Sequence, residues 1–415
     1  MPNQPIKTLL YLILLAIPRL TLAQNDLSNP AQLPWAIQWQ KDTTSFLKIR
    51  VSGGYSINTN SITSNDLTQF TYHHALTAAR KQQLMSSLLS DNIIGFGADQ
   101  CLTITFKQSA KRNFVLGLNN KNIVSFGFNN QLANLALNGN KMFAGSTANL
   151  GPSNFTNILY QQLSLGINQQ IGKGIWGLGF SVLNGMKIKQ LTLKKANLFT
   201  EAEGQYIDFD TDGNFQFSDN HNNSNGLGVS TSMSYQYLGK RNAIMVQVND
   251  LGFIHWQQLN TYQANKNYHF EGIGIADIFH FNESIFSAIN TSSITSVLGV
   301  NAESKNKNIL IPATLSIDYL HQKQKIGFGA GFKQMLFIAY SPKVYLSTSY
   351  NVSQHWWTAL TISQGGFGGF DYEIGVGGKV FHNTTCGINV HYAEWLIAPN
   401  NTSGQGINLA ITQLF

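Results

Sequence analysis

The stretch "DYEIGVGGKVF", residues 371–381, alternates between two kinds of side chain with a period of two. One set of positions is apolar apart from a single glycine: Tyr372, Ile374, Val376, Gly378 and Val380. The other set is charged or glycine: Asp371, Glu373, Gly375, Gly377 and Lys379. Because successive side chains of a β-strand point to opposite faces, this pattern predicts a strand with one apolar and one polar face.

Runs of the same kind recur from residue 92 onward. Two clear ones are "IWGLGFSV" (175–182) and the C-terminal "GINLAITQLF" (406–415). Strands of about ten residues with an apolar and a polar face are typical of outer-membrane barrels. A soluble β-sandwich shows the same alternation with its apolar face turned inward, so the pattern alone leaves both architectures open.

The composition favours the membrane barrel. Charged residues make up 11% of the chain, against about 25% in a typical soluble domain. Hydrophobic residues reach only 43%, which is too few for a helical membrane protein. Much of the rest of the chain is made up of uncharged polar residues and glycine: Asn, Gln, Ser, Thr and Gly. We therefore expect an all-β fold, a transmembrane antiparallel β-barrel with one face in outer-membrane lipid and the other in a polar lumen.

The N-terminus has the pattern of a secretory signal peptide. Lys7 precedes the apolar run "TLLYLILLAI" (8–17), and small residues lead to a cleavage site after Ala23. No later apolar run approaches the ~18 residues of a membrane-spanning helix. The sequence predicts a cleaved signal over residues 1–23 and a single outer-membrane barrel domain over residues 24–415.

The connections between the predicted strands fall into two classes. Six are short: 108–112, 170–174, 238–242, 321–325, 351–355 and 382–385. Seven are longer or irregular: 54–91, 128–155, 196–225, 263–307, 340–343, 366–369 and 397–403. Six short turns alternating with seven outer connections predict about 14 strands, within a range of 12 to 16, with both chain ends on the short-turn side.

Two outer segments have helical rather than alternating spacing, 67–90 and 277–289. We expect short helices there, the first folding over the barrel mouth. Aromatic residues near strand ends predict the interfacial girdle of a barrel, with ligand stacking as the alternative: Trp256, Tyr262, Tyr345, Trp356, Trp357, Tyr392 and Trp395.

Charged residues at polar positions of the predicted strands are candidates for the lumen: Lys107, Asp371, Glu373 and Lys379. Such charges fill a lumen with hydrogen-bonded pairs or, in a channel, tune selectivity. The sequence leaves open whether the lumen is open or plugged.

The stretch "YIDFDTDGNFQFSD" (206–219) resembles a calcium loop, because Asp208, Asp210, Asp212, Gly213 and Asp219 match its positions 1, 3, 5, 6 and 12. The flanks alternate like strands, whereas a calcium loop of this type lies between helices. We therefore favour a hairpin turn with Gly213 at positive φ. Calcium binding by the four aspartates is the alternative.

The sequence contains no hydrolase, zinc-protease, redox or phosphate-binding motif, so we expect neither an enzyme nor a bound cofactor. The net charge of +7 is spread thinly, without a basic run, so we do not expect nucleic acid as a partner. Cys101 and Cys386 fall on opposite faces of their predicted strands, which favours two free thiols.

Several motifs resemble a group of Gram-negative outer-membrane proteins known only as a domain of unknown function. They are "NPA" (29–31), "LNGNKMFAGST" (137–147), "VNDLGFIHW" (248–256) and the run that begins with "LIPATLSIDY" (310–319). "NPA" near the mature N-terminus also resembles barrels of the long-chain fatty-acid transporter type. The resemblance implies a 14-stranded outer-membrane barrel and assigns no substrate.

Two hypotheses for function follow. The first is a barrel that binds or transports a hydrophobic or amphiphilic small molecule, in an apolar pocket of the upper lumen lined by the 67–90 helix. The second is a structural or accessory barrel whose long outer loops bind surface, secreted or periplasmic proteins.

Overall fold

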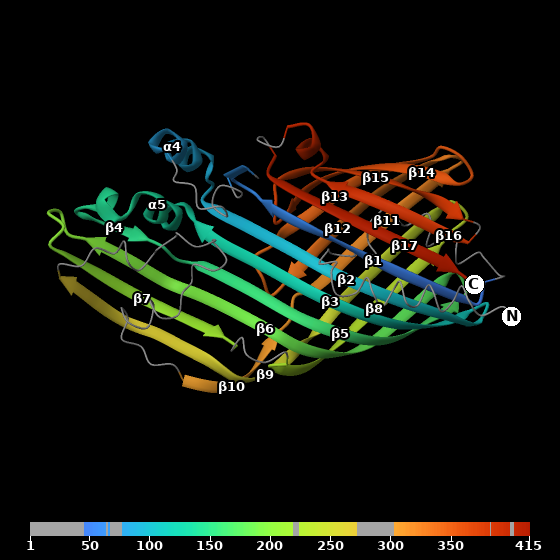
Figure 1. Ribbon diagram of the computed structural model, residues 1–415, viewed down its shortest axis with the longest axis horizontal. Helices are drawn as coiled ribbons and strands as arrows, with labels where there is room; N and C mark the ends of the chain where they lie inside the picture. Colours follow the sequence, from blue (N-terminus) through green and yellow to red (C-terminus); the bar gives the residue numbers. More distant parts are fainter. Residues whose placement is uncertain are drawn as a thin grey trace.

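The computed structural model describes residues 45–63, 65–66, 77–218, 224–271, 303–381, 383–398 and 402–415. Within these ranges 14 strands pair antiparallel in one closed ring, which confirms the predicted barrel (Figure 1). In ring order they are β1 (Leu47–Thr59), β2 (Asp91–Ser109), β3 (Arg112–Asn129), β5 (Ser153–Ile171), β6 (Gly174–Thr200), β8 (Gly226–Leu238), β9 (Asn242–Glu271), β11 (Ala313–Lys323), β12 (Ile326–Leu336), β13 (Ser341–Asn351), β14 (Trp356–Gly366), β15 (Phe370–Phe381), β16 (Thr384–His391) and β17 (Gly404–Leu414). Pairing of β1 with β17 closes the ring.

The alternation that predicted the strands separates the two faces of the barrel wall. On β15, Tyr372 and Ile374 are 45% and 44% exposed on the outer face, whereas Asp371 and Glu373 are 2% and 7% exposed on the inner face. Exposed apolar side chains recur around the ring, as they must where a wall faces lipid rather than water.

All six predicted short turns connect the expected strands, and the start of β1 and the end of β17 lie at the same end of the barrel. Short turns face the periplasm in outer-membrane barrels. We call this the short-turn end and the opposite one the long-loop end. Figure 1 shows the C-terminus at the short-turn end, on the right.

Strands β6 and β9 continue past the ring, with lengths of 27 and 30 residues. Beyond the barrel they pair with three further strands, β4 (Ser146–Asn149), β7 (Tyr206–Phe217) and β10 (Glu303–Leu310). We call this extension at the long-loop end, at the left of Figure 1, the outer wing.

The predicted hairpin turn at Gly213 is wrong. Strand β7 runs unbroken through residues 206–217, and Gly213 pairs with Leu193 on β6 and Ala264 on β9. Because β7 has a partner on both sides, its backbone groups are used in ladders and the chain continues straight. The turn lies earlier, at 201–205, where Gly204 has φ of 76°.

Four short helices lie in the described loops: α4 (Ala78–Ser87), α5 (Asn130–Asn138), η1 (Asn140–Phe143) and η3 (Ala393–Leu396). Helix α4 falls in the predicted 67–90 segment and is capped by Thr77, whose hydroxyl accepts from the Arg80 amide. Its C-cap, Leu88, is extended, so the helix is shorter than predicted. In the described part of the chain, no helix is long and apolar enough to cross a membrane.

Some predictions concern residues outside the described ranges. These are the signal peptide at 1–23, the start of the 67–90 helix, the 277–289 helix and Asp219.

Candidate functional site in the barrel lumen

Two of the four predicted lumenal charges, Asp371 and Glu373, lie together near the outer end of β15. The carboxylate of Asp371 accepts a hydrogen bond of 2.7 Å from the Tyr392 amide and pairs with Lys343 at 3.4 Å. Glu373 contacts Nδ1 of His391 at 3.2 Å. The structure therefore places these acids in cross-strand pairs that tie the lumenal faces of β13, β15 and β16 together.

Lys107 and Lys379 are not part of this group. Lys379 pairs in register with Thr385 beside the turn between β15 and β16, and the Lys107 amide bonds to the Phe46 carbonyl at the start of β1. Both lie toward the short-turn end, so the four predicted residues form two separate groups. A role for either group in selectivity stays a prediction.

A second polar cluster, which the sequence did not reveal, crosses the lumen. Lys121 on β3 and Asp250 on β9 are joined by an ion pair of 2.5 Å, although β5, β6 and β8 separate their strands in the ring. Gln162 on β5 donates to the other oxygen of Asp250 at 2.7 Å and to Ser181 at 3.0 Å. These contacts run through the interior rather than along the wall.

Asp250 reaches the lumen because β9 carries a β-bulge there. Asn249 and Asp250 together oppose Ser232 of β8, and the Asp250 amide donates to the Ser232 hydroxyl at 3.1 Å. Asp250 has φ of 60°, a conformation that aspartate tolerates better than most residues. A bulge inserts one residue and so exchanges the two faces of the strand beyond it.

The exchange brings Ile254 and Trp256 into the lumen, where both are fully buried. They belong to an apolar cluster whose members come from opposite sides of the ring and from two loops: Ile123, Ile158, Tyr160, Leu183, Ile188, Ile254, Trp256, Leu259, Ile309, Ile311, Met335 and Phe367. We call this set the lumenal apolar cluster. Along β3, β5 and β9, the lumenal apolar cluster lies closer to the long-loop end than the Lys121–Asp250 pair does.

Phe367, from the loop between β14 and β15, crosses the lumen to Gly95 on β2. A Cβ atom added to Gly95 would lie 1.9 Å from the Phe367 ring, so glycine is needed for this approach. Tyr340, from the loop between β12 and β13, meets the Phe367 ring edge-on at 4.9 Å. Strands β16, β17 and β1 separate β15, at the base of the Phe367 loop, from Gly95 on β2.

The loop that carries Tyr340 also reaches the opposite wall. The Ser125 hydroxyl on β3 donates to the Ala339 carbonyl at 2.9 Å. Beside it, Gly127 leaves only 3.0 Å between an added Cβ and the Ala339 side chain. Two loops therefore fill the outer part of the lumen with their own residues.

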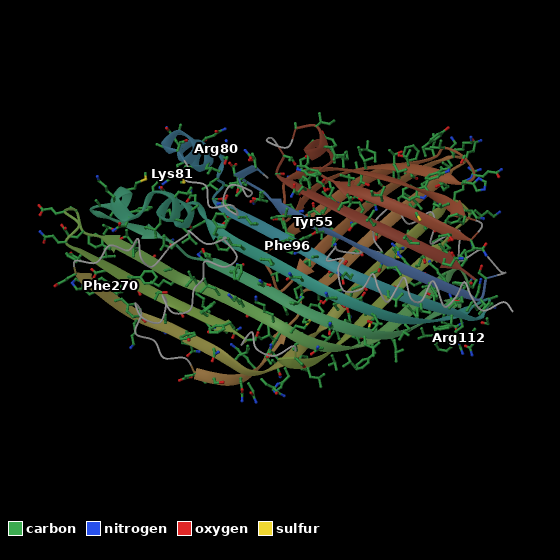
Figure 2. All side chains as sticks on the ribbon, in the orientation of Figure 1. Tyr55, Arg80, Lys81, Phe96, Arg112 and Phe270 are labelled. Atoms are coloured by element: carbon green, nitrogen blue, oxygen red, sulfur yellow. The ribbon has the colours of Figure 1, made fainter. Side chains whose placement is uncertain are left out.

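Helix α4 does not line this cluster, which corrects the expectation for residues 78–87; residues 67–76 lie outside the described ranges. Its buried residue, Leu84, packs with Ile62, Ile94 and Phe128 in a separate cluster. Ile94 lies on the opposite face of β2 from Gly95, so α4 covers the outside of the wall. Figure 2 shows Arg80 and Lys81 projecting from this helix beyond the ring.

The girdle predicted from aromatic residues is also partly wrong. Trp256, Tyr345, Trp357 and Tyr392 are 7% exposed or less. Trp356, by contrast, is 48% exposed beside a short turn, where a girdle residue is expected. The error arises because i and i+1 aromatics lie on opposite faces and because the bulge at Asp250 turns Trp256 inward.

The aspartates of the calcium-like stretch lie along the polar face of the outer wing. Asp208 contacts Nδ1 of His269 at 2.6 Å, and Asp210 pairs with Lys195. Hydrogen bonds that the His269 ring donates to Asp208 and then to Glu271 raise the pKa of His269 above its usual value. In the ranges that the structure describes, no three His, Cys, Asp or Glu residues are grouped so as to hold a metal ion. Calcium binding stays a prediction.

The sequence from residue 39 to residue 382 matches the model of a family of unknown function, DUF5723. The chain belongs to this family. Membership confirms the resemblance that the motifs indicated, and the matched range includes the Lys121–Asp250 pair and the whole lumenal apolar cluster. A comparison of this family member with curated proteins finds no match.

Among the solved structures that resemble this member of the family are two toluene transporters and a FadL homologue. The Pseudomonas putida toluene transporter TodX has 9% identity and a TM-score of 0.46, with 95% of each chain covered. The Ralstonia pickettii toluene transporter TbuX has 9% identity and a TM-score of 0.44, with 90% of each chain covered. A Pseudomonas aeruginosa FadL homologue has 9% identity and a TM-score of 0.42, with 89% and 90% covered. Our assignment of the barrel rests on its own strand pairing.

Proposed function

We propose that this chain is a non-enzymatic outer-membrane barrel that binds or transports a hydrophobic or amphiphilic small molecule through the outer part of its lumen. The lumenal apolar cluster carries this proposal. The interior of a membrane barrel is ordinarily polar, yet here apolar side chains from opposite walls meet inside the ring. An apolar interior favours an apolar ligand because burial removes the ligand from water.

Two loops supply the residues that a ligand would replace: Phe367 of the cluster and Tyr340, which packs against it. Phe367 and Tyr340 lie outside the strands that form the wall, so their displacement breaks no pairing of the barrel. A ligand ring or alkyl chain that took the place of Phe367 would contact Gly95 and the neighbouring apolar side chains.

The polar clusters suit the other end of an amphiphile. The Lys121–Asp250 pair and the Lys343–Asp371 pair lie on the short-turn side of the apolar cluster or beside it. A polar headgroup would then meet charged and amide groups while its tail stays among apolar side chains.

Binding of an apolar fluorescent probe, N-phenylnaphthylamine, to the protein in neutral detergent tests this proposal. We expect Phe367→Ala to change the probe affinity by about tenfold, the effect of roughly 1.4 kcal/mol. The control is Phe370→Ala, which removes the same ring from the outer face of β15, where it is 47% exposed. Equal effects of both substitutions, or no probe binding by any form, would contradict the proposal.

Native mass spectrometry of protein extracted gently from its own membrane is the complementary measurement. A reproducible added mass of small-molecule size supports the proposal. A much larger added mass would instead support the accessory barrel that binds a protein partner.

A further inference from the structure

The short-turn end of the barrel is strongly basic over part of its circumference. Four consecutive turns, which connect β2 to β3, β5 to β6, β8 to β9 and β11 to β12, contain Lys111, Arg112, Lys173, Lys240, Arg241, Lys323 and Lys325. We call these seven residues the basic arc. The same four turns contain no Asp or Glu, and the two remaining turns, at 351–355 and 382–385, contain no Lys or Arg.

The cations of the basic arc are accessible. All seven are exposed, and none forms an ion pair with another residue that the structure describes. Arg112 donates one hydrogen bond, from Nε to the Gln169 side chain at 2.7 Å. Its terminal nitrogens remain for another acceptor, and Figure 2 shows its side chain at the short-turn end.

The position of the basic arc along the membrane normal follows from the residues beside each turn. Exposed apolar residues on the outer face lie within three positions of each turn: Phe114 beside Arg112, Ile171 beside Lys173, Ile244 beside Arg241 and Ile326 beside Lys325. Those side chains belong in hydrocarbon. At about 3.3 Å per residue, the cations lie less than about 10 Å beyond the apolar band, at the level of lipid headgroups.

We propose that the basic arc binds anionic phospholipid headgroups of the membrane leaflet at the short-turn end. Lysine and arginine pair with phosphate by charge-assisted hydrogen bonds, and an anionic lipid leaves net negative charge to match an arc without acids. A lipid fits better than an acidic protein because each of the four turns borders an exposed apolar residue that the lipid's own acyl chains cover. This inference concerns the opposite end of the barrel from the lumenal apolar cluster and does not depend on the proposed function.

The test compares an arc variant with a variant of equal charge change. The arc variant carries Lys111→Gln, Arg112→Gln, Lys240→Gln and Arg241→Gln. The control carries Lys141→Gln, Lys194→Gln, Lys266→Gln and Lys305→Gln, which are exposed residues at or near the outer wing. The thermal midpoint of each protein is measured in neutral detergent, with added phosphatidylglycerol or phosphatidylcholine.

We expect phosphatidylglycerol to raise the midpoint of the wild type and the control, and the arc variant to lose at least half of that rise. Phosphatidylcholine should give no comparable rise. At about 1 M NaCl, where the Debye length is about 3 Å, the wild type should lose most of the effect as well, which tests the idea without any substitution.

Two results would overturn the proposal. One is a full phosphatidylglycerol effect in the arc variant, or an equal effect of phosphatidylcholine on the wild type. The other is an acidic protein that copurifies with the wild type and not with the arc variant while both respond equally to phosphatidylglycerol. That second result would assign the basic arc to a protein partner.

Discussion

Lys121 and Asp250 form an ion pair across the lumen, although three strands separate β3 from β9 in the ring. The pair joins the two walls at the point where the bulge in β9 turns Asp250 inward. Gln162 bonds to the second carboxylate oxygen, so both oxygens of Asp250 have partners. The contact fixes the distance between β3 and β9 on the short-turn side of the lumenal apolar cluster.

Removal of the cation from this pair should destabilise the barrel strongly. Lys121→Met leaves Asp250 as a buried charge without its counter-charge, which costs about 3–5 kcal/mol. Urea unfolding in lipid vesicles, followed by the shift in electrophoretic mobility between folded and unfolded barrel, measures the change. The control is Lys195→Met, which removes the cation of an exposed pair on the outer wing and should cost less than about 1 kcal/mol. Similar losses in both variants would show that the lumenal pair has no special role.

A methyl group at Gly95 should displace the Phe367 ring. Gly95→Ala places a Cβ atom where the ring now lies, and overpacking of this kind costs about 1–3 kcal/mol. Because the ring belongs to a loop, part of the strain is relieved by moving it, and the substitution should also alter probe binding. In a Phe367→Ala background, the same Gly95→Ala substitution should cost little further stability, because the ring that it would meet is gone.

Gly117→Ala is the matched control, since it adds the same atom to β3 with the nearest neighbour at 3.4 Å. It should affect neither stability nor probe binding. An equal cost of Gly95→Ala in the presence and in the absence of the Phe367 ring would contradict the observed packing.

The outer wing should be more stable against local unfolding at low pH. The pKa of His269 is raised by Asp208 first and by Glu271 second, so the folded state binds its proton more tightly than the unfolded state. The stabilisation is therefore complete below the ordinary histidine pKa of about 6.5 and is lost as pH rises through the raised value. Hydrogen exchange of β7 and the outer part of β9, corrected for the intrinsic effect of pH, should show more protection at low pH.

Asp208→Asn should remove most of this pH dependence, whereas Asp210→Asn, which affects the partner of Lys195, should leave it in place. Equal pH dependence in the Asp208→Asn variant and the wild type would sink the assignment to His269.

Truncation of Leu84 should loosen α4 without changing the lumen. Leu84 is 2% exposed in the cluster on the outer face of the wall, and Leu→Ala substitutions at such sites cost about 2–5 kcal/mol. We expect faster proteolysis around 78–87 and unchanged probe binding. Leu89→Ala, at a position 48% exposed, is the control. Altered probe binding in Leu84→Ala would reinstate α4 as a lining of the binding region.

The alternation of side chains was enough to predict the barrel wall. In residues 371–381 the alternation placed Asp371 and Glu373 on the lumenal face and Tyr372 on the outer face. This works because a strand has only two faces and the outer face of the wall contacts lipid. The six short turns followed from where the alternating runs stop. A strand count could then be made from the sequence, since each turn joins two strands that run in opposite directions.

The lumenal site could not be predicted in the same way. Before the bulge, Ile244 faces outward and is 41% exposed, so an unbroken alternation would also place Ile254 and Trp256 in lipid. One inserted residue at Asn249–Asp250 exchanges the inward-facing and outward-facing positions of β9. The local sequence pattern does not reveal this bulge, which becomes visible only when the pairing of β9 with β8 is known. The partner of Asp250 is 129 residues away, at Lys121. Contacts of this kind depend on the closure of the ring rather than on local spacing.

The contacts of Phe367 with Gly95 and of Ser125 with Ala339 have a consequence for biogenesis. Each joins a loop from the C-terminal half of the chain to a strand of the N-terminal half, so both contacts need the two halves of the barrel to be in place. An incompletely assembled barrel would present an unobstructed bore. Permeability to small solutes would then distinguish unfinished molecules from mature ones, because the obstruction needs residues from both halves of the chain.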